Sequence, residues 1–286
     1  MDEKFQYLVL RSFIDITRIL PKKWVYSLLK GISLSFYTLS KRRREVTIDN
    51  LKQAFPEKSD QETAHLSKAV FIELSKTVAE IFLMLTGRFD PDQAVVNRDE
   101  AIRKLKVLRN TYSGGWMMVT AHFSNWELLA QVLAKNGFPM LIVGREGDNK
   151  LIDKNITLPL RQRYGSRTVY KKKAAVAILK SLKRGEIVGA LIDQKVNAQE
   201  GLKVKFFGRE VYMTGLVATM KQKLNITVIP IFLPRIGEGK YKIVMEEPIE
   251  VSDDAVHMTQ AYSDALERVI KAYPEQWFWM HNRWKV

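Results

Sequence analysis

From residue 116 onward, short apolar runs alternate with segments of helical character, and this alternation constrains the fold more than any other feature. Residues 116–121 form an apolar run typical of a buried strand, and a helix is predicted at 124–136, where Gly137 ends it. The pattern continues with predicted strands at 139–143, 167–170, 187–192, 227–233 and 240–245 and helices at 151–164, 174–184, 214–224 and 259–272. Such alternation indicates an α/β fold, in which helices cover both faces of a central sheet.

The first hundred residues are predicted to be mostly helical, and the first forty are strongly apolar. In a helix at 5–20, Arg11, Asp15 and Arg18 recur at i, i+4 and i+7 and form one polar stripe, as in helices that lie in a membrane interface. A second apolar helix is predicted at 24–39. No uncharged stretch approaches the ~20 residues that a simple membrane span needs. We therefore expect 1–44 to associate with a membrane surface and 45–286 to form a catalytic domain; a first helix packed in the core is the alternative.

The chain is strongly basic, with a net charge of +15 and a pI of about 9.8. Such a balance favours acidic partners, which include nucleic acid, anionic lipid and acidic proteins. The basic residues cluster at 41–44, 171–173, 180–184 and 203–209. No zinc-finger or RNP-type motif is present, so nucleic acid is not a predicted partner. The absence of cysteine excludes disulfides, a cysteine nucleophile and a cysteine-based zinc site.

The segment from His122 to Glu127 is the best candidate for chemistry. His122 is predicted at the end of a buried strand, and Glu127 lies about one and a half helical turns farther on. If the carboxylate bonds one nitrogen of the imidazole, the other nitrogen is free to take a proton from an alcohol. Spacing alone also fits a structural histidine with a solvent-facing glutamate. The sequence has no H-E-x-x-H pair, nucleophile elbow, P-loop or G-x-G-x-x-G motif, so neither a metal nor a cofactor is predicted.

The segment His-Phe-Ser-Asn-Trp-Glu at 122–127 resembles the H-x-x-x-x-[DE] signature of glycerolipid acyltransferases. Its details are similar to those of the bacterial lipid A biosynthesis (late) acyltransferases. Other blocks resemble the same family in order and spacing: R-x(n)-N-L-x-x-A-F-P at 43–56, a second block at 144–163, a third at 192–215, a fourth around Pro230, and P-E-Q-x-x-W-x-H-x-R-W at 274–284. The resemblance covers nearly the whole chain.

This resemblance implies a glycerolipid acyltransferase-like fold, with a central mixed sheet flanked by helices. It also implies transfer of a fatty acyl chain from acyl carrier protein to a hydroxyl of a lipid A precursor, at the cytoplasmic face of the inner membrane. His122 would be the general base and Glu127 the residue that orients it. The resemblance further implies site roles for Arg161 and Asp193.

Candidates for binding phosphate are Arg145, Lys205 and Arg209, because cationic side chains suit phosphate oxygens. The alternatives are plain: Arg161 as a surface charge, Asp193 as a turn residue, and the other three as solvated loop charges. Phe206 and Phe207 fit core packing better than an acyl groove.

Three other functions stay open at this point. The acceptor could be another glycolipid or phospholipid, the same dyad could hydrolyse acyl thioesters with water, or the chain could be a non-enzymatic, basic lipid-binding protein.

Overall fold

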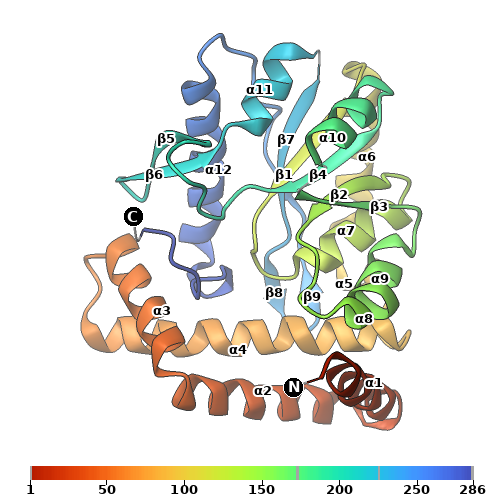
Figure 1. Cartoon of the computed structure of the whole chain (residues 1–286), viewed down its shortest axis with the longest axis vertical. Helices are drawn as coiled ribbons and strands as arrows, with labels where there is room; N and C mark the ends of the chain where they lie inside the picture. Colours follow the sequence, from red (N-terminus) through yellow and green to blue (C-terminus); the bar gives the residue numbers. More distant parts are fainter. Residues whose placement is uncertain (1, 172–173, 225, 285–286) are drawn as a thin grey trace.

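A six-stranded sheet forms the centre of the protein (Figure 1). The computed structural model describes residues 2–171, 174–224 and 226–284. The strand order is β10-β7-β1-β4-β2-β3. Five strands are parallel and β10 pairs antiparallel with β7, so the sheet is mixed and the predicted fold class is confirmed. The strands are β1 (Trp116–Thr120), β2 (Met140–Gly144), β3 (Arg167–Tyr170), β4 (Ile187–Leu191), β7 (Thr227–Phe232) and β10 (Val244–Met245).

Helices cover both faces of the sheet. Side chains alternate between the faces along each strand, so both faces carry apolar side chains that the helices bury. Met117 packs in one core cluster and Met118 in the other. The cluster around Met117 is covered by α10 (Ala174–Lys183), α11 (Leu216–Lys223) and α12 (Ala255–Ala272). The cluster around Met118 is covered by α6 (Arg98–Thr111), α7 (Trp126–Lys135) and α9 (Leu158–Gln162). Central strands covered in this way are apolar throughout, as the runs at 116–120 and 227–232 are.

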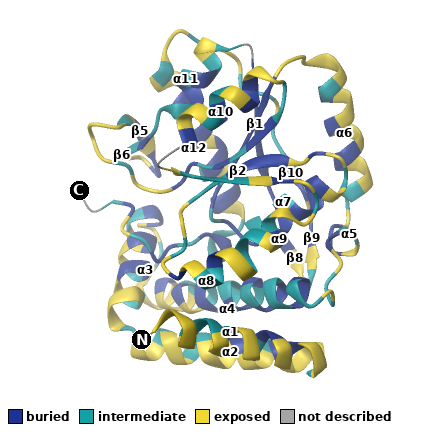
Figure 2. Cartoon of the chain, turned by 45° about the vertical axis from the view of Figure 1, so that its right-hand side comes forward, coloured by how far each residue is buried: buried dark blue, intermediate teal, exposed yellow. Residues whose placement is uncertain are grey.

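A layer of helices lies beneath the carboxyl edge of the sheet (Figure 1). It consists of α1 (Glu3–Ile19), α2 (Lys22–Leu39), α3 (Lys41–Ala54) and α4 (Asp60–Leu85). A capping box between Ser59 and Glu62 begins α4. Val25 and Leu29 of α2 pack on Leu83 of α4, while the outer surface of α1 and α2 is largely exposed (Figure 2). Within the described ranges, no helix has the length and apolarity that crossing a bilayer requires.

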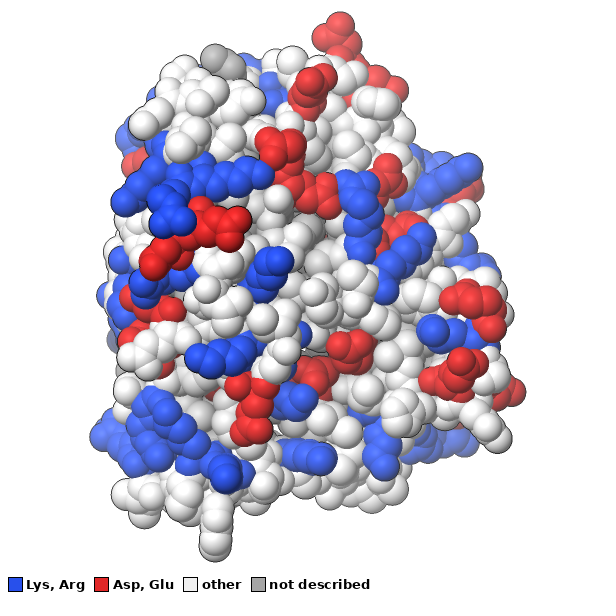
Figure 3. All heavy atoms as spheres, turned by 180° about the vertical axis from the view of Figure 1, so that it is seen from behind, with Lys and Arg blue, Asp and Glu red and all other residues white. Residues whose placement is uncertain are grey.

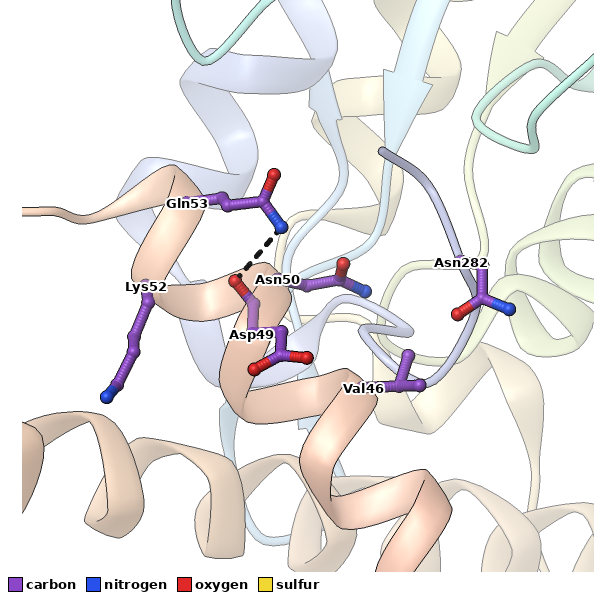
Figure 4. Close-up of a pocket in the computed structure, with 6 residues that line it drawn as sticks. All are labelled: Val46, Asp49, Asn50, Lys52, Gln53 and Asn282. Carbon is purple, nitrogen blue, oxygen red and sulfur yellow. Dashed lines mark hydrogen bonds between the residues drawn. The ribbon is translucent and has the colours of Figure 1, made fainter. Parts of the chain in front are cut away.

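The amino-terminal and carboxy-terminal sequence blocks meet at α3. Asn50 donates to the carbonyl oxygens of Trp279 and His281, at 2.7 Å each. Arg43 Nη1 donates to the carbonyl of Met280 at 2.8 Å. Figure 4 shows Asn50 pointing toward the carboxy-terminal segment, across a surface pocket of about 280 Å³. These residues thus hold the end of the chain against α3.

Several elements differ from the sequence-based expectation. The basic run at 203–209 forms a hairpin of β5 (Gly201–Phe206) and β6 (Arg209–Thr214), so α11 begins two residues later than predicted. The predicted edge strand at 240–245 is divided: β9 (Lys240–Tyr241) pairs with β8 (Arg235–Gly237), and only β10 joins the sheet. The predicted helix at 151–164 is interrupted, with α8 (Lys150–Ile152), a π-helical turn (Asp153–Thr157) and α9 in succession. A short helix α5 (Pro91–Ala94) and a terminal 3-10 turn (Pro274–Gln276) complete the elements.

Two of the basic clusters need comment. Residues 41–44 are the first turn of α3, where Arg44 donates to the carbonyl oxygens of Tyr37 and Thr38 at the end of α2. In the cluster at 171–173, Lys172 and Lys173 lie outside the described residues.

Candidate active site

His122 lies two residues beyond β1 and is held by the carboxylate of Asp193. Its Nδ1 is 2.9 Å from Asp193 Oδ1, and its backbone N–H donates to Asp193 Oδ2 at 3.0 Å. Trp277 Nε1 also donates to Oδ2, at 2.9 Å. Asp193 is fully buried. One carboxylate therefore fixes both the backbone and the ring of His122.

The register of the sheet explains this pairing. Strand β4 lies beside β1, with Thr120 opposite Leu191, and the ladder continues with a bond from Ile192 N to Thr120 O. His122 and Asp193 each lie two residues beyond those strand ends. Side chains that follow neighbouring parallel strands meet at the same sheet edge, where sites in α/β folds tend to lie.

The electrostatics of the pair define the state of the ring. Burial raises the pKa of Asp193, but the charge and hydrogen bond of His122 and the bond from Trp277 outweigh it and lower that pKa to about 2. Asp193 is thus ionised at neutral pH and can only accept hydrogen bonds. The hydrogen of the His122–Asp193 bond therefore lies on His122 Nδ1, and in the neutral ring Nε2 is the nitrogen that can accept a proton.

The free nitrogen faces a polar neighbour and is flanked by aromatic rings. Gln194 Nε2 lies 3.4 Å from His122 Nε2, which suits a donor amide opposite an accepting nitrogen. The rings of Trp126 and Phe278 lie 5.2 and 6.4 Å from the imidazole, between centroids. His122, Trp126 and Gln194 all line the cavity described below.

The expected bond from Glu127 to His122 is replaced by one to Arg161, and this corrects the prediction. Arg161 Nε lies 3.1 Å from both oxygens of Glu127, and Arg161 Nη2 forms an ion pair with Oε1. Burial would lower the pKa of Arg161, but the hydrogen bonds and charge of Glu127 outweigh it and raise that pKa. The physical reason is position: Glu127 lies in the first turn of α7 and faces α9, whereas the ring of His122 faces the end of β4.

Buried polar contacts fix the loop that joins His122 to α7. Asn125 Oδ1 accepts from Leu128 N at 3.0 Å and caps α7, while Asn125 Nδ2 donates to Glu80 Oε2 at 2.9 Å. Glu80 is fully buried and also pairs with Arg235 and Tyr241. In the same loop, Ser124 has a φ of +51°, a region that residues other than glycine seldom adopt. Backbone strain of this kind gathers at functional sites.

A cavity of about 590 Å³ opens beside His122. At its mouth lie polar and aromatic side chains: Thr120, His122, Trp126, Glu127, Arg145, Arg161 and Gln194. The rest of the lining comes from both faces of the sheet and is mostly apolar: Met118, Leu129, Met140 and Ile142 lie on the α7 side, and Ala174, Ala190 and Val217 lie on the other, together with the polar Lys171, Glu200 and Thr214. An apolar cavity with a few converging polar groups at its mouth is typical of a site for a small ligand or an apolar chain.

The predicted site residues divide into two groups. His122, Glu127, Arg145 and Arg161 line the cavity, and Asp193 bonds His122 from below. Arg145 is exposed and pairs with Asp148.

Lys205 and Arg209 lie instead on the β5–β6 hairpin, outside the set of described residues that line the cavity. The backbone of Lys205 bonds Gln260, and Arg209 Nε donates to Gln53 O at 3.3 Å. Phe206 and Phe207 are buried in the core. The sequence analysis did not name Gln194, which lies beside His122, or Trp277, which donates to Asp193, as site residues. Gln194 could have been named because it follows Asp193 directly in the sequence.

Among the described residues, no three histidine or acidic side chains gather closely enough to hold a metal ion.

A sequence profile of bacterial lipid A biosynthesis acyltransferases matches residues 4–286. The chain belongs to this family. Among curated relatives, the lipid A biosynthesis lauroyltransferase of Escherichia coli K12 is 28% identical over 281 residues, which is 93% of this chain and 87% of that protein. The palmitoleoyltransferase of the same organism is 25% identical, covering 86% of this chain and 80% of its own. A Haemophilus influenzae lipid A biosynthesis acyltransferase is 23% identical, covering 84% and 75%. The chain is thus an acyltransferase of the late lipid A type, as the resemblance implied.

Proposed function

We propose that this protein transfers a fatty acyl chain from acyl carrier protein to a hydroxyl of a lipid A precursor, with His122 as general base. One observation carries the proposal: His122 Nδ1 is bonded to the ionised Asp193, while its Nε2 faces a cavity with an apolar interior. This arrangement leaves one basic nitrogen available at the point where an acyl thioester and a hydroxyl would meet.

The reaction follows from the dyad. The acceptor hydroxyl displaces Gln194 from His122 Nε2 and gives its proton to that nitrogen as its oxygen attacks the thioester carbonyl. Asp193 stabilises the imidazolium that forms. The carbon–sulfur bond then breaks, and the proton passes from His122 to the leaving thiolate. General base catalysis of this kind contributes roughly 10²–10⁴-fold.

We assign Glu127 and Arg161 to the mouth of the cavity rather than to the orientation of His122. The pair is largely buried, and Arg161 Nη1 would lie only 3.1 Å from a Cβ placed on Gly144. Glycine at 144 therefore leaves room for the guanidinium. With Arg145 also at the mouth, this part of the cavity carries the cationic groups that a phosphorylated acceptor needs.

The surface of α1 and α2 fits an anionic membrane. Of the seventeen exposed large hydrophobic side chains among the described residues, ten lie between Phe5 and Leu39. Trp24, Leu28, Ile32 and Phe36 recur every fourth residue and so share one face of α2. In Figure 3, uncharged side chains project below a row of basic ones at the edge where Figure 1 places these helices. Apolar groups beside basic ones suit binding at the cytoplasmic face of the inner membrane.

The donor proposal rests on charge. Acyl carrier proteins are acidic, and a net charge of +15 would speed their association with this chain.

Mass spectrometry of a defined reaction tests the proposal. Purified protein, lauroyl acyl carrier protein and a phosphorylated lipid A precursor should give a product heavier by one acyl group. His122→Ala should lower the rate by roughly 10²–10⁴-fold without loss of helical circular dichroism. His257→Ala, at an exposed position on α12, is the matched control and should keep the rate. Release of free fatty acid with no acylated precursor would instead indicate a thioesterase, and a folded His122→Ala variant at full rate would refute the mechanism.

A further inference from the structure

The cavity beside His122 has two parts, separated by the sheet edge. Gly189 and Ala190 are neighbours on β4 and therefore face opposite sides of the sheet, yet both line the cavity. On the α7 side, the lining beyond the mouth is wholly apolar: Met118, Leu129, Leu133, Met140, Ile142 and Gly189. We call this part the α7 arm. The opposite part also carries Lys171, Glu200 and Thr214, so it is less suited to an alkyl chain.

The depth of the α7 arm follows from the sheet register. Thr120, Leu191 and Gly144 end their strands at the mouth, and Met118, Gly189 and Ile142 form the next row on the same face. Met140 lies one row deeper, opposite Ile187. From Gly144 to the backbone of Met140 is four residues of strand, or roughly 13 Å at about 3.3 Å per residue, which is the greatest depth that this row order allows. The Met140 thioether reaches back to the row of Gly189 and fills the inner part of that depth.

Met140 closes the inner end of the arm because residue 189 is glycine. A Cβ on Gly189 would lie 2.6 Å from Met140 Sδ and 3.5 Å from its Cγ. The thioether therefore rests directly over the Cα of Gly189, in space that any other residue would take. Glycine inside a central strand weakens it and often marks a close approach of this kind. Methionine, in turn, is flexible enough to move when the contact changes.

We propose that Gly189 and Met140 set the length of the acyl chain that this enzyme transfers, by forming the end of the α7 arm. This inference rests on the proposed function. A methyl group at 189 displaces the Met140 thioether into the arm and shortens it, whereas loss of the Met140 side chain lengthens it. The two substitutions therefore shift the preferred chain in opposite directions.

The experiment measures kcat/KM with lauroyl, myristoyl and palmitoyl acyl carrier protein for each variant. Gly189→Ala should raise the ratio of lauroyl to palmitoyl transfer, and Met140→Ala should lower it. Each shift should be about 10-fold or more, since one methylene in an apolar pocket changes discrimination by that order. Gly189→Ala/Met140→Ala removes the clash and should shift the ratio back toward longer chains relative to Gly189→Ala alone.

Ala190→Val is the matched control, because it adds bulk from the same strand into the opposite part of the cavity. Its ratio of lauroyl to palmitoyl transfer should stay within about 3-fold of wild type. Unchanged ratios in both Gly189→Ala and Met140→Ala, or a shift with Ala190→Val alone, would overturn the assignment. Should Gly189→Ala fail to fold, Met140→Ala still decides. Failure of the proposed function would look different, because the wild type would then acylate no precursor with any donor.

Discussion

Replacing Asp193 with asparagine exchanges one oxygen for an NH₂ group, so the group that faces His122 Nδ1 donates a hydrogen bond instead of accepting one. Two donors, His122 N and Trp277 Nε1, converge on Asp193 Oδ2, so in Asp193→Asn they hold the amide oxygen at that place. The NH₂ group then occupies the place of Oδ1 and faces His122 Nδ1 at about 2.9 Å. Since an amide NH₂ only donates, Nδ1 must accept and the proton moves to Nε2. The nitrogen that should take the proton of the hydroxyl is then blocked.

The expected loss in kcat is about 10⁴-fold, the size found when the aspartate of a serine-protease triad becomes asparagine and imposes the wrong tautomer. The acyl-transfer assay gives the rate, and ¹⁵N NMR of labelled histidine gives the tautomer; His65→Gln, His257→Gln and His281→Gln spectra assign the four signals. Glu127→Gln is the comparison: it should weaken the contact with Arg161 but leave the proton on His122 Nδ1. Near-normal kcat in Asp193→Asn, or a tautomer change in Glu127→Gln alone, would refute the reasoning.

Four further expectations concern stability and surfaces. Glu80→Ala removes one of the two carboxylates that pair with the buried Arg235, and Glu73 remains as the other; it should lower the free energy of unfolding in urea by about 1–3 kcal/mol, against under ~0.5 kcal/mol for the exposed Glu57→Ala, and equal effects would refute a stabilising role for Glu80. The pKa of Asp193 falls from 3.8 to about 2 on folding; its stabilisation of about 2 kcal/mol is therefore present above pH 4 and lost as pH falls toward 2. Asp193→Asn should lack that step, and a wild-type titration without it would count against an ionised Asp193. Trp24→Asp/Leu28→Asp should weaken binding to anionic vesicles in a flotation assay by 10-fold or more, roughly 0.8 kcal/mol being lost per buried CH₂, while the matched Val107→Asp on α6 should not; equal loss would exclude a specific role for α2. Transfer from acyl carrier protein should slow more steeply with added salt than transfer from the acyl phosphopantetheine alone, and parallel salt curves would argue against electrostatic steering.

The sequence predicted the central strands well, because strands buried on both faces must be apolar along their length. It could not give their order. Strand β2 follows β1 along the chain, but β4 lies beside β1, and only that order brings Asp193 to His122, which lies 71 positions earlier in the chain. The nearby Glu127 was the natural partner from spacing alone. Its actual partner, Arg161, is set by the packing of α9 against α7, which no local pattern encodes.

The sequence of the β5–β6 hairpin has the alternating pattern of a strand, but its many basic residues drew the interpretation toward a charge cluster. Lys203 and Lys205 are exposed, while Val204 and Phe206 between them are buried. This alternation is the two-residue period of a strand with one face toward the core. Because the run was interpreted as a basic cluster, Lys205 and Arg209 became candidates for phosphate binding. The place of Lys205 on the outer face of the hairpin is set by Val204 and Phe206, which pack inward.

The layer that carries the proposed membrane surface also supports the loop between His122 and α7. Tyr26 of α2 donates to Glu80 of α4 at 3.2 Å, and Glu80 in turn accepts from Asn125 at the start of α7. One turn earlier on the same face of α4, Thr77 donates to the carbonyl of Ser124 at 3.1 Å.

A membrane that contacts the outer side of α2 would thus be separated from the loop after His122 by α2 and α4. At the same end of the molecule, the carbonyl of Glu3 in α1 accepts from Asn149 at 2.8 Å, four residues beyond Arg145 at the cavity mouth. We infer that the acceptor need only raise its headgroup past α1 to reach His122, while its own acyl chains stay in the bilayer. Added vesicles should therefore accelerate acylation of a soluble acceptor analogue without acyl chains much less than they accelerate acylation of the lipid. If vesicles accelerate acylation of that analogue as much as they accelerate acylation of the lipid, the membrane acts on the enzyme rather than by presenting the acceptor.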